Sequence, residues 1–324
     1  MKPNLNNIFK WSIANGLMAT GIVKNAIQKS MQGEHILTIY FHDPSKKEFE
    51  DAIKWLLKHN FQFISPEDLL LIVQNKKPFP KGAIMITVDD GWKNNEVNIV
   101  EVANKYRIPV CIFVATEAVE NGKYWWPKAI RANRLNPKII PDVKDLKKIP
   151  NSERLDLINQ IQEPDIYGRE AMDIDQIKRI SQSPYIHIGA HTHSHPILPN
   201  CSYEQSFEEL KLSKEKLESW TGKPITTFAY PNGDFTTREI YFLSQLNYKL
   251  AFTCEPSFIK KQHLLSPLKI PRFAFLEGAT MAENICRMVG IWQPMRDKVR
   301  YSLFHKKADY SEYKFENESK NVNT

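Results

Sequence analysis

The sequence predicts an α/β protein built on parallel strands, and we favour a barrel over a doubly wound sheet. From residue 36 onward, short apolar segments typical of strands alternate with longer segments of helical periodicity. This alternation is typical of parallel strands wrapped by helices, and both architectures contain it. Reactive side chains recur where predicted strands end, which is where parallel barrels place their chemistry. They are Asp89, Asp90, His191 and Tyr230.

Apolar spacing and helix start signals define the first half of this region. Ser65 and Pro66, followed by two acidic residues, are typical of a helix start, because serine caps the first turn and the helix dipole favours acids there. The expected strands are 36–41, 61–64, 83–88 and 108–115, and the expected helices are 46–59, one beginning at 66, and 96–106.

The second half repeats the pattern after an interruption. Residues 117–171 contain Trp125-Trp126-Pro127, scattered prolines and only short helical patches, so we expect an insertion or lid. After it we expect strands at 185–190, 226–230 and 248–253 and helices at 173–181, 203–220 and 237–246. The predicted division is a helical extension at 1–34, a barrel at 35–290 that carries the insertion, and a basic, polar tail at 291–324.

Composition limits the classes of partner. With 42% hydrophobic and 25% charged residues the chain is globular, and its net charge of +7 favours acidic surfaces such as anionic lipid, acidic glycan or nucleic acid. Nucleic acid is not predicted, because no stripe of basic and aromatic residues with a module signature occurs. The four cysteines have no CxxC spacing, so reduced thiols are expected.

The N-terminal segment at 11–23 allows two interpretations. It is a poorly formed secretory signal, because Asn15 and Gly16 interrupt it and no small-residue cleavage site follows, or an amphipathic helix lying on the protein or on a membrane surface. It is too short to cross a bilayer, which takes about 20 apolar residues. We expect a cytoplasmic or membrane-associated protein, with export as the alternative.

Two adjacent aspartates, Asp89 and Asp90, close the apolar run 83–88 and precede Gly91. Burying two carboxylates is costly unless a cation compensates them, and a metal ion is the usual one. The alternative is an N-cap pair that opens the next helix. Side chains alternate along a strand, so the two carboxylates cannot do the same job, and one facing a metal and one facing the reaction centre is a natural division.

A histidine cluster, His191-Thr192-His193-Ser194-His195, closes the second apolar run at 185–190. His191 and His195 could turn inward from a loop that leaves the strand, whereas His193 is expected on the surface or behind the ligands. The alternative is an ordinary polar loop. With a carboxylate, two imidazoles form a zinc site that leaves a position open for water; the same set also suits non-haem iron, but no oxygenase context is present.

These residues lie in three motifs that resemble those of the polysaccharide deacetylases of carbohydrate esterase family four, the NodB homology domain. The motifs are Thr87-Val88-Asp89-Asp90-Gly91, His191 to His195, and the aromatic-proline turn Phe228-Ala229-Tyr230-Pro231-Asn232-Gly233. The resemblance covers roughly residues 36–275. It implies a distorted, partly open (β/α)7 barrel, with Asp89 as general base and with Asp90, His191 and His195 holding Zn²⁺ or another divalent transition metal.

Two departures from the family pattern change the expected roles. The third motif has Ala229 where the family carries an arginine, so Arg272 becomes the candidate to steady the base. The late Leu-x-His motif is missing, and His42 at the end of the first strand resembles the acid histidine of the circularly permuted branch, which includes poly-N-acetylglucosamine deacetylases. The oxyanion is expected at the Tyr230–Gly233 turn, with the backbone N–H of Asn232 as candidate donor.

By this resemblance the chain is expected to remove N-acetyl groups from an N-acetylhexosamine-containing polysaccharide or glycan precursor. The alternatives are an O-deacetylase or other amide hydrolase with the same metal, and a non-catalytic glycan-binding relative. Trp125 and Trp126 are expected to stack on sugar rings or to pack in the core or lid. The expected partner is the glycan, with peripheral membrane association as a further expectation and no prediction of the oligomeric state.

Overall fold

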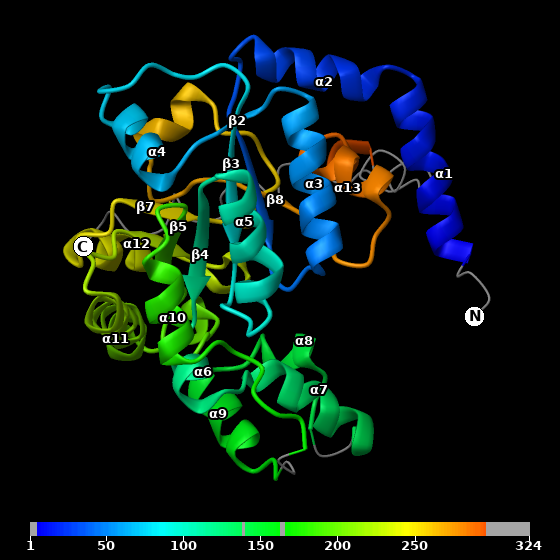
Figure 1. Cartoon of the computed structure of the whole chain (residues 1–324). Helices are drawn as coiled ribbons and strands as arrows, with labels where there is room; N and C mark the ends of the chain where they lie inside the picture. The colour runs from blue at the N-terminus through cyan, green and yellow to red at the C-terminus, as the bar shows by residue number, and fades with distance from the viewer. Residues whose placement is uncertain (1–4, 138–139, 163–165, 296–324) are drawn as a thin grey trace, which may run out of the picture.

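The computed structural model describes residues 5–137, 140–162 and 166–295, and within them one curved, parallel sheet carries the fold (Figure 1). Seven strands follow one path in the order β7-β6-β5-β4-β3-β1-β8, and β2 pairs with β3 beside it. The strands are β1 (Leu37–Phe41), β2 (Gln62–Phe63), β3 (Ala83–Val88), β4 (Val110–Val114), β5 (Ile186–Ala190), β6 (Thr227–Ala229), β7 (Leu250–Phe252) and β8 (Phe273–Ala274).

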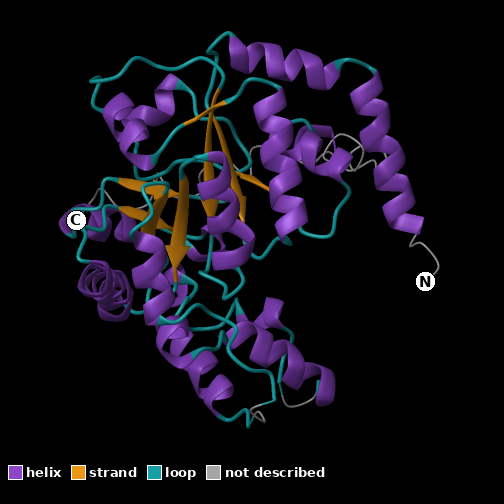
Figure 2. Ribbon diagram, in the orientation of Figure 1, coloured by secondary structure: helices purple, strands orange, loops and turns teal. Residues whose placement is uncertain are grey.

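Helices lie around this sheet and beyond the C-terminal ends of its strands (Figure 2). They are α1 (Leu5–Ala19), α2 (Ile22–Met31), α3 (Lys46–Lys58), α4 (Pro66–Val73), α5 (Glu101–Tyr106), α6 (Thr116–Asn121), α7 (Trp125–Leu135), α8 (Val143–Leu146), α9 (Asn151–Asn159), α10 (Ile174–Ser181), α11 (Tyr203–Thr221), α12 (Thr237–Gln245) and α13 (Met281–Met288). The Ser65 cap predicted for α4 is present, because its hydroxyl accepts from the Asp68 N–H at 3.1 Å.

The two ends of the sheet do not pair directly as strands, and the barrel is therefore partly open. The segment before β8 bridges the gap to β7, since the Ile270 N–H donates to the Ala251 carbonyl at 2.8 Å and the Thr253 N–H donates to the Ile270 carbonyl at 2.8 Å. The predicted fold class, a distorted and partly open (β/α)7 barrel, is confirmed.

Strand register aligns the ends that carry the motifs. Phe41 of β1 lies opposite Val88 of β3, and Val114 of β4 lies opposite Ala190 of β5. The ladder continues one step further, because the Asp89 N–H donates to the Phe41 carbonyl at 2.8 Å and the His191 N–H to the Val114 carbonyl at 3.0 Å. The residues that follow β1, β3 and β5 therefore meet at one edge of the sheet.

Two apolar layers follow from the alternation of side chains along the strands. On β3, Ile84 and Ile86 face the helices and join the large outer core, whereas Ala83 and Met85 face the barrel interior. Each such fully buried aliphatic side chain contributes about 1.5–3 kcal/mol. Asp89 continues the interior face, so its carboxylate lies at the C-terminal end of the apolar barrel interior.

The first two helices lie along one side of the barrel. Helix α1 packs against α13, with Ala14 fully buried at the contact. Helix α2 is joined to the loop that leads into β3, since the Gly82 N–H donates to the Ser30 carbonyl at 2.7 Å. Among the described residues no helix is both long and apolar enough to cross a membrane. The predicted domain boundaries stay predictions, and the tail from residue 296 lies outside the described residues.

The segment from α6 to α9 forms a separate layer beyond the C-terminal ends of the strands (Figure 1). Helices α7, α8 and α9 enclose a small apolar cluster of their own, which includes Ala129, Leu146 and Ile158.

The four cysteines are free thiols, as their spacing predicted.

Candidate active site

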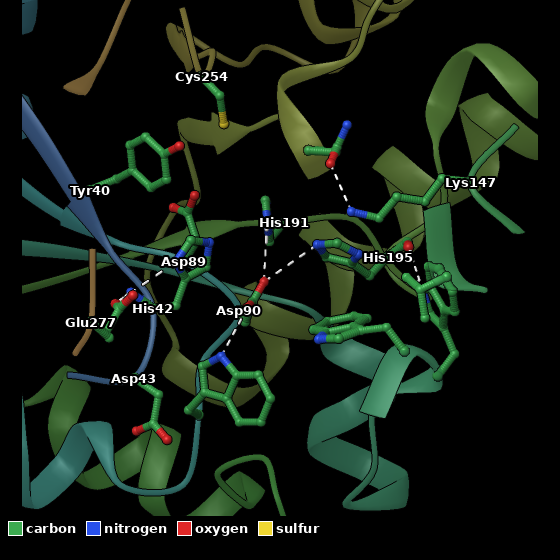
Figure 3. Close-up of a pocket in the computed structure, with 15 residues that line it drawn as sticks. Tyr40, His42, Asp43, Asp89, Asp90, Lys147, His191, His195, Cys254 and Glu277 are labelled. Atoms are coloured by element: carbon green, nitrogen blue, oxygen red, sulfur yellow. Dashed lines mark hydrogen bonds and ion pairs between the residues drawn. The ribbon is translucent and has the colours of Figure 1, made fainter. Parts of the chain in front are cut away.

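Three ligand-type side chains converge at the edge where β3 and β5 end. One carboxylate oxygen of Asp90, Oδ1, lies 3.4 Å from the Nε2 atom of His191 and 3.4 Å from the Nε2 atom of His195 (Figure 3). All three residues are buried, and their donor atoms lie within 4.8 Å of one another, which is close enough to hold a metal ion. Asp90 has a left-handed backbone, with φ of 76°, and alternation along the chain places its carboxylate on the side opposite to that of Asp89.

Two aromatic side chains donate hydrogen bonds to Asp90, one of them to its second carboxylate oxygen. Trp92 donates its indole N–H to Asp90 Oδ2 at 2.9 Å, and the Tyr124 hydroxyl donates to the Asp90 carbonyl at 3.2 Å. Burial alone would raise the pKa of Asp90, but its hydrogen bonds with His191 and His195 hold that pKa well below the usual value. The carboxylate is therefore anionic, and its Oδ1 atom faces both imidazoles.

The two histidines are held in different ways. His191 Nδ1 lies 2.7 Å from the Ala229 carbonyl, which leaves Nε2 facing Asp90. Burial would lower the pKa of His191, but the carboxylates of Asp90 and Asp89 raise it. For His195, burial prevails and lowers the pKa to about 4. A neutral imidazole with a free Nε2 is the form that ligates a metal.

Asp89 forms a buried, bidentate ion pair with Arg272. The guanidinium donates from Nη1 to Oδ1 at 2.7 Å and from Nη2 to Oδ2 at 2.8 Å, and both side chains are almost completely buried. Burial alone would raise the pKa of Asp89, but Arg272 holds it below the usual value. The arginine enters from the segment before β8 and is held there by the Thr253 carbonyl, which accepts from its Nε at 2.9 Å. It does not line the cavity, so it contacts the carboxylate rather than a substrate.

His42 follows β1 and lines the opposite side of the cavity from His195 (Figure 3). Its backbone N–H donates to Glu277 Oε1 at 2.9 Å, and its Nδ1 lies 3.9 Å from the same oxygen. Its side chain is 43% exposed, so a proton on it can reach a bound molecule. Neighbouring Asp43 also lines the cavity, and burial raises the pKa of its carboxyl.

The aromatic-proline turn differs from the prediction at Tyr230, which does not contact the cavity. Tyr230 is fully buried, and its hydroxyl donates to the Leu268 carbonyl at 2.9 Å. Its backbone N–H donates to the Phe252 carbonyl at 3.0 Å. The reason is strand alternation, which places Phe228 and Tyr230 together in the outer core. Asn232 does line the cavity, with a left-handed backbone at φ of 59°.

The proposed metal ligands, Asp89, His42 and Asn232 line one cavity of about 470 Å³. Its floor is made of the strand ends, and the α7–α8 region supplies one wall, with Trp125, Trp126 and Lys147. Lys147 donates from Nζ to Asn232 Oδ1 at 2.8 Å, which connects that wall to the turn after β6. The sequence predictions did not include Lys147, Trp92 or Glu277. Only Trp92 had a local signal, because it directly follows the Asp-Asp-Gly motif.

The fold and the site together place carboxylates and imidazoles at the strand ends of a partly open parallel barrel. The family model described as polysaccharide deacetylase matches residues 76–251, which is more than half of the chain. The chain belongs to the polysaccharide deacetylase family, as its three motifs predicted.

Two curated relatives show the range of similarity. YxkH of Bacillus subtilis, assigned by name to the polysaccharide deacetylases, is 23% identical over 212 residues, covering 65% of this chain and 58% of its own. The poly-β-1,6-N-acetyl-D-glucosamine N-deacetylase of Staphylococcus aureus is 32% identical over 87 residues, covering 24% of this chain and 30% of its own. The chain therefore spans less than two thirds of the length of either relative.

Solved structures share the fold. The Streptococcus pyogenes deacetylase PplD, in complex with acetate, aligns with a TM-score of 0.58 and 17% identity, over 79% of this chain and 98% of its own. IcaB from Ammonifex degensii aligns with a TM-score of 0.59 and 17% identity, over 80% of this chain and 97% of its own. At these identities the likeness shows the barrel and its helices.

Proposed function

We propose that this protein is a metal-dependent N-deacetylase that acts on a glycan containing N-acetylhexosamine. The observation that carries the proposal is the convergence of Asp90, His191 and His195 beside a second carboxylate, Asp89, which is held ionised by Arg272. The substrate named for the Staphylococcus aureus relative, a β-1,6-linked N-acetylglucosamine polymer, supports this substrate class.

The donor set fits a divalent transition metal, with zinc as the first choice. One carboxylate oxygen and two imidazole nitrogens are typical of catalytic zinc sites, which keep a position open for water. A divalent cation would also compensate the buried carboxylate of Asp90, which faces both imidazoles. When bound, such an ion would polarise the acetyl carbonyl and acidify a water molecule.

The residues of this chain then divide the remaining chemistry. Asp89, kept anionic by Arg272, takes a proton from the attacking water. The backbone N–H of Asn232, a residue that lines the cavity, would donate to the oxygen that becomes negative. His42 gives a proton to the sugar nitrogen as the carbon–nitrogen bond breaks, so that acetate and a free amine leave. Peripheral membrane association and cellular location stay predictions.

The test combines zinc content with acetate release from a β-1,6-linked N-acetylglucosamine oligomer. Asp90→Ala should lose both bound zinc and activity. Asp89→Asn should keep zinc, because Asp89 is not among the proposed ligands, and lose about 10²–10⁴-fold in rate, because the base is removed. The matched control is Asp145→Asn, an exposed carboxylate near the cavity wall that should change neither. Full zinc content in Asp90→Ala would contradict the ligand assignment, and release only from O-acetylated glycans would contradict the substrate class.

A further inference from the structure

The two histidines of the proposed metal site differ in what holds their rings. A histidine that ligates a metal through one nitrogen usually donates its other ring N–H to a carbonyl, carboxylate or water, which fixes the ring. His191 meets this expectation through the Ala229 carbonyl. His195 does not, because its Nδ1 is buried without a hydrogen-bond partner in the described part of the chain. Something else must therefore orient the His195 imidazole.

The backbone of His195 is held by two side chains from the helices beyond the strand ends. Its carbonyl accepts the indole N–H of Trp125 at 2.9 Å and a guanidinium N–H of Arg154 at 3.3 Å. These donors begin α7 and lie within α9, respectively. The backbone needs such restraint because His195 is left-handed, with φ of 53°, a conformation that non-glycine residues seldom adopt. The neighbouring Trp126 ring also contacts the His195 ring, with centroids 4.4 Å apart.

Arg154 is an unusual residue to find in this place. It is 1% exposed, it makes no ion pair among the described residues, and its Nε and Nη2 groups have no hydrogen-bond partner there. Its guanidinium lies over the Trp125 ring, 4.3 Å from the centroid. Arginine is seldom buried without a partner, because desolvating its charge is costly. Its polar contacts in the described part of the chain are with the Trp125 ring and the His195 carbonyl.

We propose that α7 and α9 are part of the metal site, with Trp125 and Arg154 acting as positioning residues that fix the His195 ligand through its backbone carbonyl. This inference rests on the proposed metal-dependent function. The insertion would then have a second role besides forming the cavity wall. How its helices pack on the strand ends would determine how tightly the site binds metal. The hydrogen bond that His195 lacks at its ring is replaced by two at its carbonyl.

The test measures zinc affinity by competition with a chelator, without substrate. Trp125→Phe removes the N–H and keeps a ring beneath Arg154, and Arg154→Met removes the second donor and the charge. Each should weaken zinc binding about 10–100-fold, the usual effect of losing support for a ligand. Arg154→Lys should recover part of that loss. Lys148→Ala, an exposed change in the same segment, should bind zinc like the wild type.

Cobalt(II) substitution adds a second measurement, because its visible spectrum reports the ligand geometry. Altered spectra in Trp125→Phe and Arg154→Met, with unfolding temperatures of the metal-free proteins near wild type, support the proposal. Folded variants with wild-type zinc affinity and spectra overturn it. If one variant fails to fold, the other removes a donor from a different helix and decides alone. Wild-type protein that binds no zinc would instead refute the proposed function.

Discussion

Replacing Arg272 with methionine tests how the charge of Asp89 is held. The arginine donates twice to Asp89, once to the Thr253 carbonyl at 2.9 Å and once to the Thr87 hydroxyl at 3.0 Å, all inside the barrel. Methionine fills much of the same volume and supplies neither charge nor donors. Because the pair is fully buried, water cannot replace the lost interactions.

The expected loss follows from that burial. Removing one partner of a buried ion pair costs about 3–5 kcal/mol, because the remaining charge is left uncompensated. In the wild type the lowered pKa of Asp89 stabilises the fold above the unfolded value, near 3.8, and this contribution is lost as pH falls further. In Arg272→Met, burial raises the pKa of Asp89, and only His191 and His42 still act to lower it. The difference in free energy of unfolding between wild type and Arg272→Met should therefore shrink as pH falls from 7 towards 4.

The assay is urea unfolding of the metal-free protein across this pH range, with Asp89→Asn and the double variant for comparison. The double variant should be more stable than the sum of the single losses predicts, because neither charge remains. A deficit below about 1 kcal/mol at pH 7, or one that does not depend on pH, would show that the pair does not hold Asp89 ionised.

Two further predictions concern the fold. In Gly189→Ala, a Cβ atom on β5 would lie 2.5 Å from the Phe113 ring, so we expect a loss of about 1–3 kcal/mol in urea unfolding. Gly16→Ala in α1, with open space around it, should instead be neutral or stabilising, and equal effects would refute the steric argument. Burial lowers the pKa of His35 to about 4, so the free energy of unfolding should fall as pH drops from 6.5 to 4. His35→Phe should remove about 1–2 kcal/mol of that change, a figure reduced for solvent screening, and an unchanged pH profile would contradict it.

The sequence predicted those parts of the site that directly follow a buried strand. Asp89, Asp90 and His191 are of this kind, and parallel strands bring their ends to one edge whatever the intervening segments do. The role of Tyr230 was misjudged, although alternation along β6 already placed it with Phe228 on the helical side. The fold class and the family are confirmed.

Other contacts could not be read from the sequence, because they depend on how distant segments dock. Glu277 reaches the His42 N–H across 235 positions, and Lys147 reaches Asn232 across 85. The indole of Trp125 meets the His195 carbonyl only because the inserted helices fold back over the strand ends. No local pattern of charge or hydropathy specifies such pairings.

The separation between Asp89 and Arg272 also matters during synthesis. The two residues are 183 positions apart, so a growing polypeptide carries this aspartate for more than half of its length before the matching cation leaves the ribosome. Until then the carboxylate has no guanidinium beside it, and water or a proton must satisfy it. The C-terminal end of the barrel interior can therefore exclude water and close only late in translation, when β8 pairs with β1.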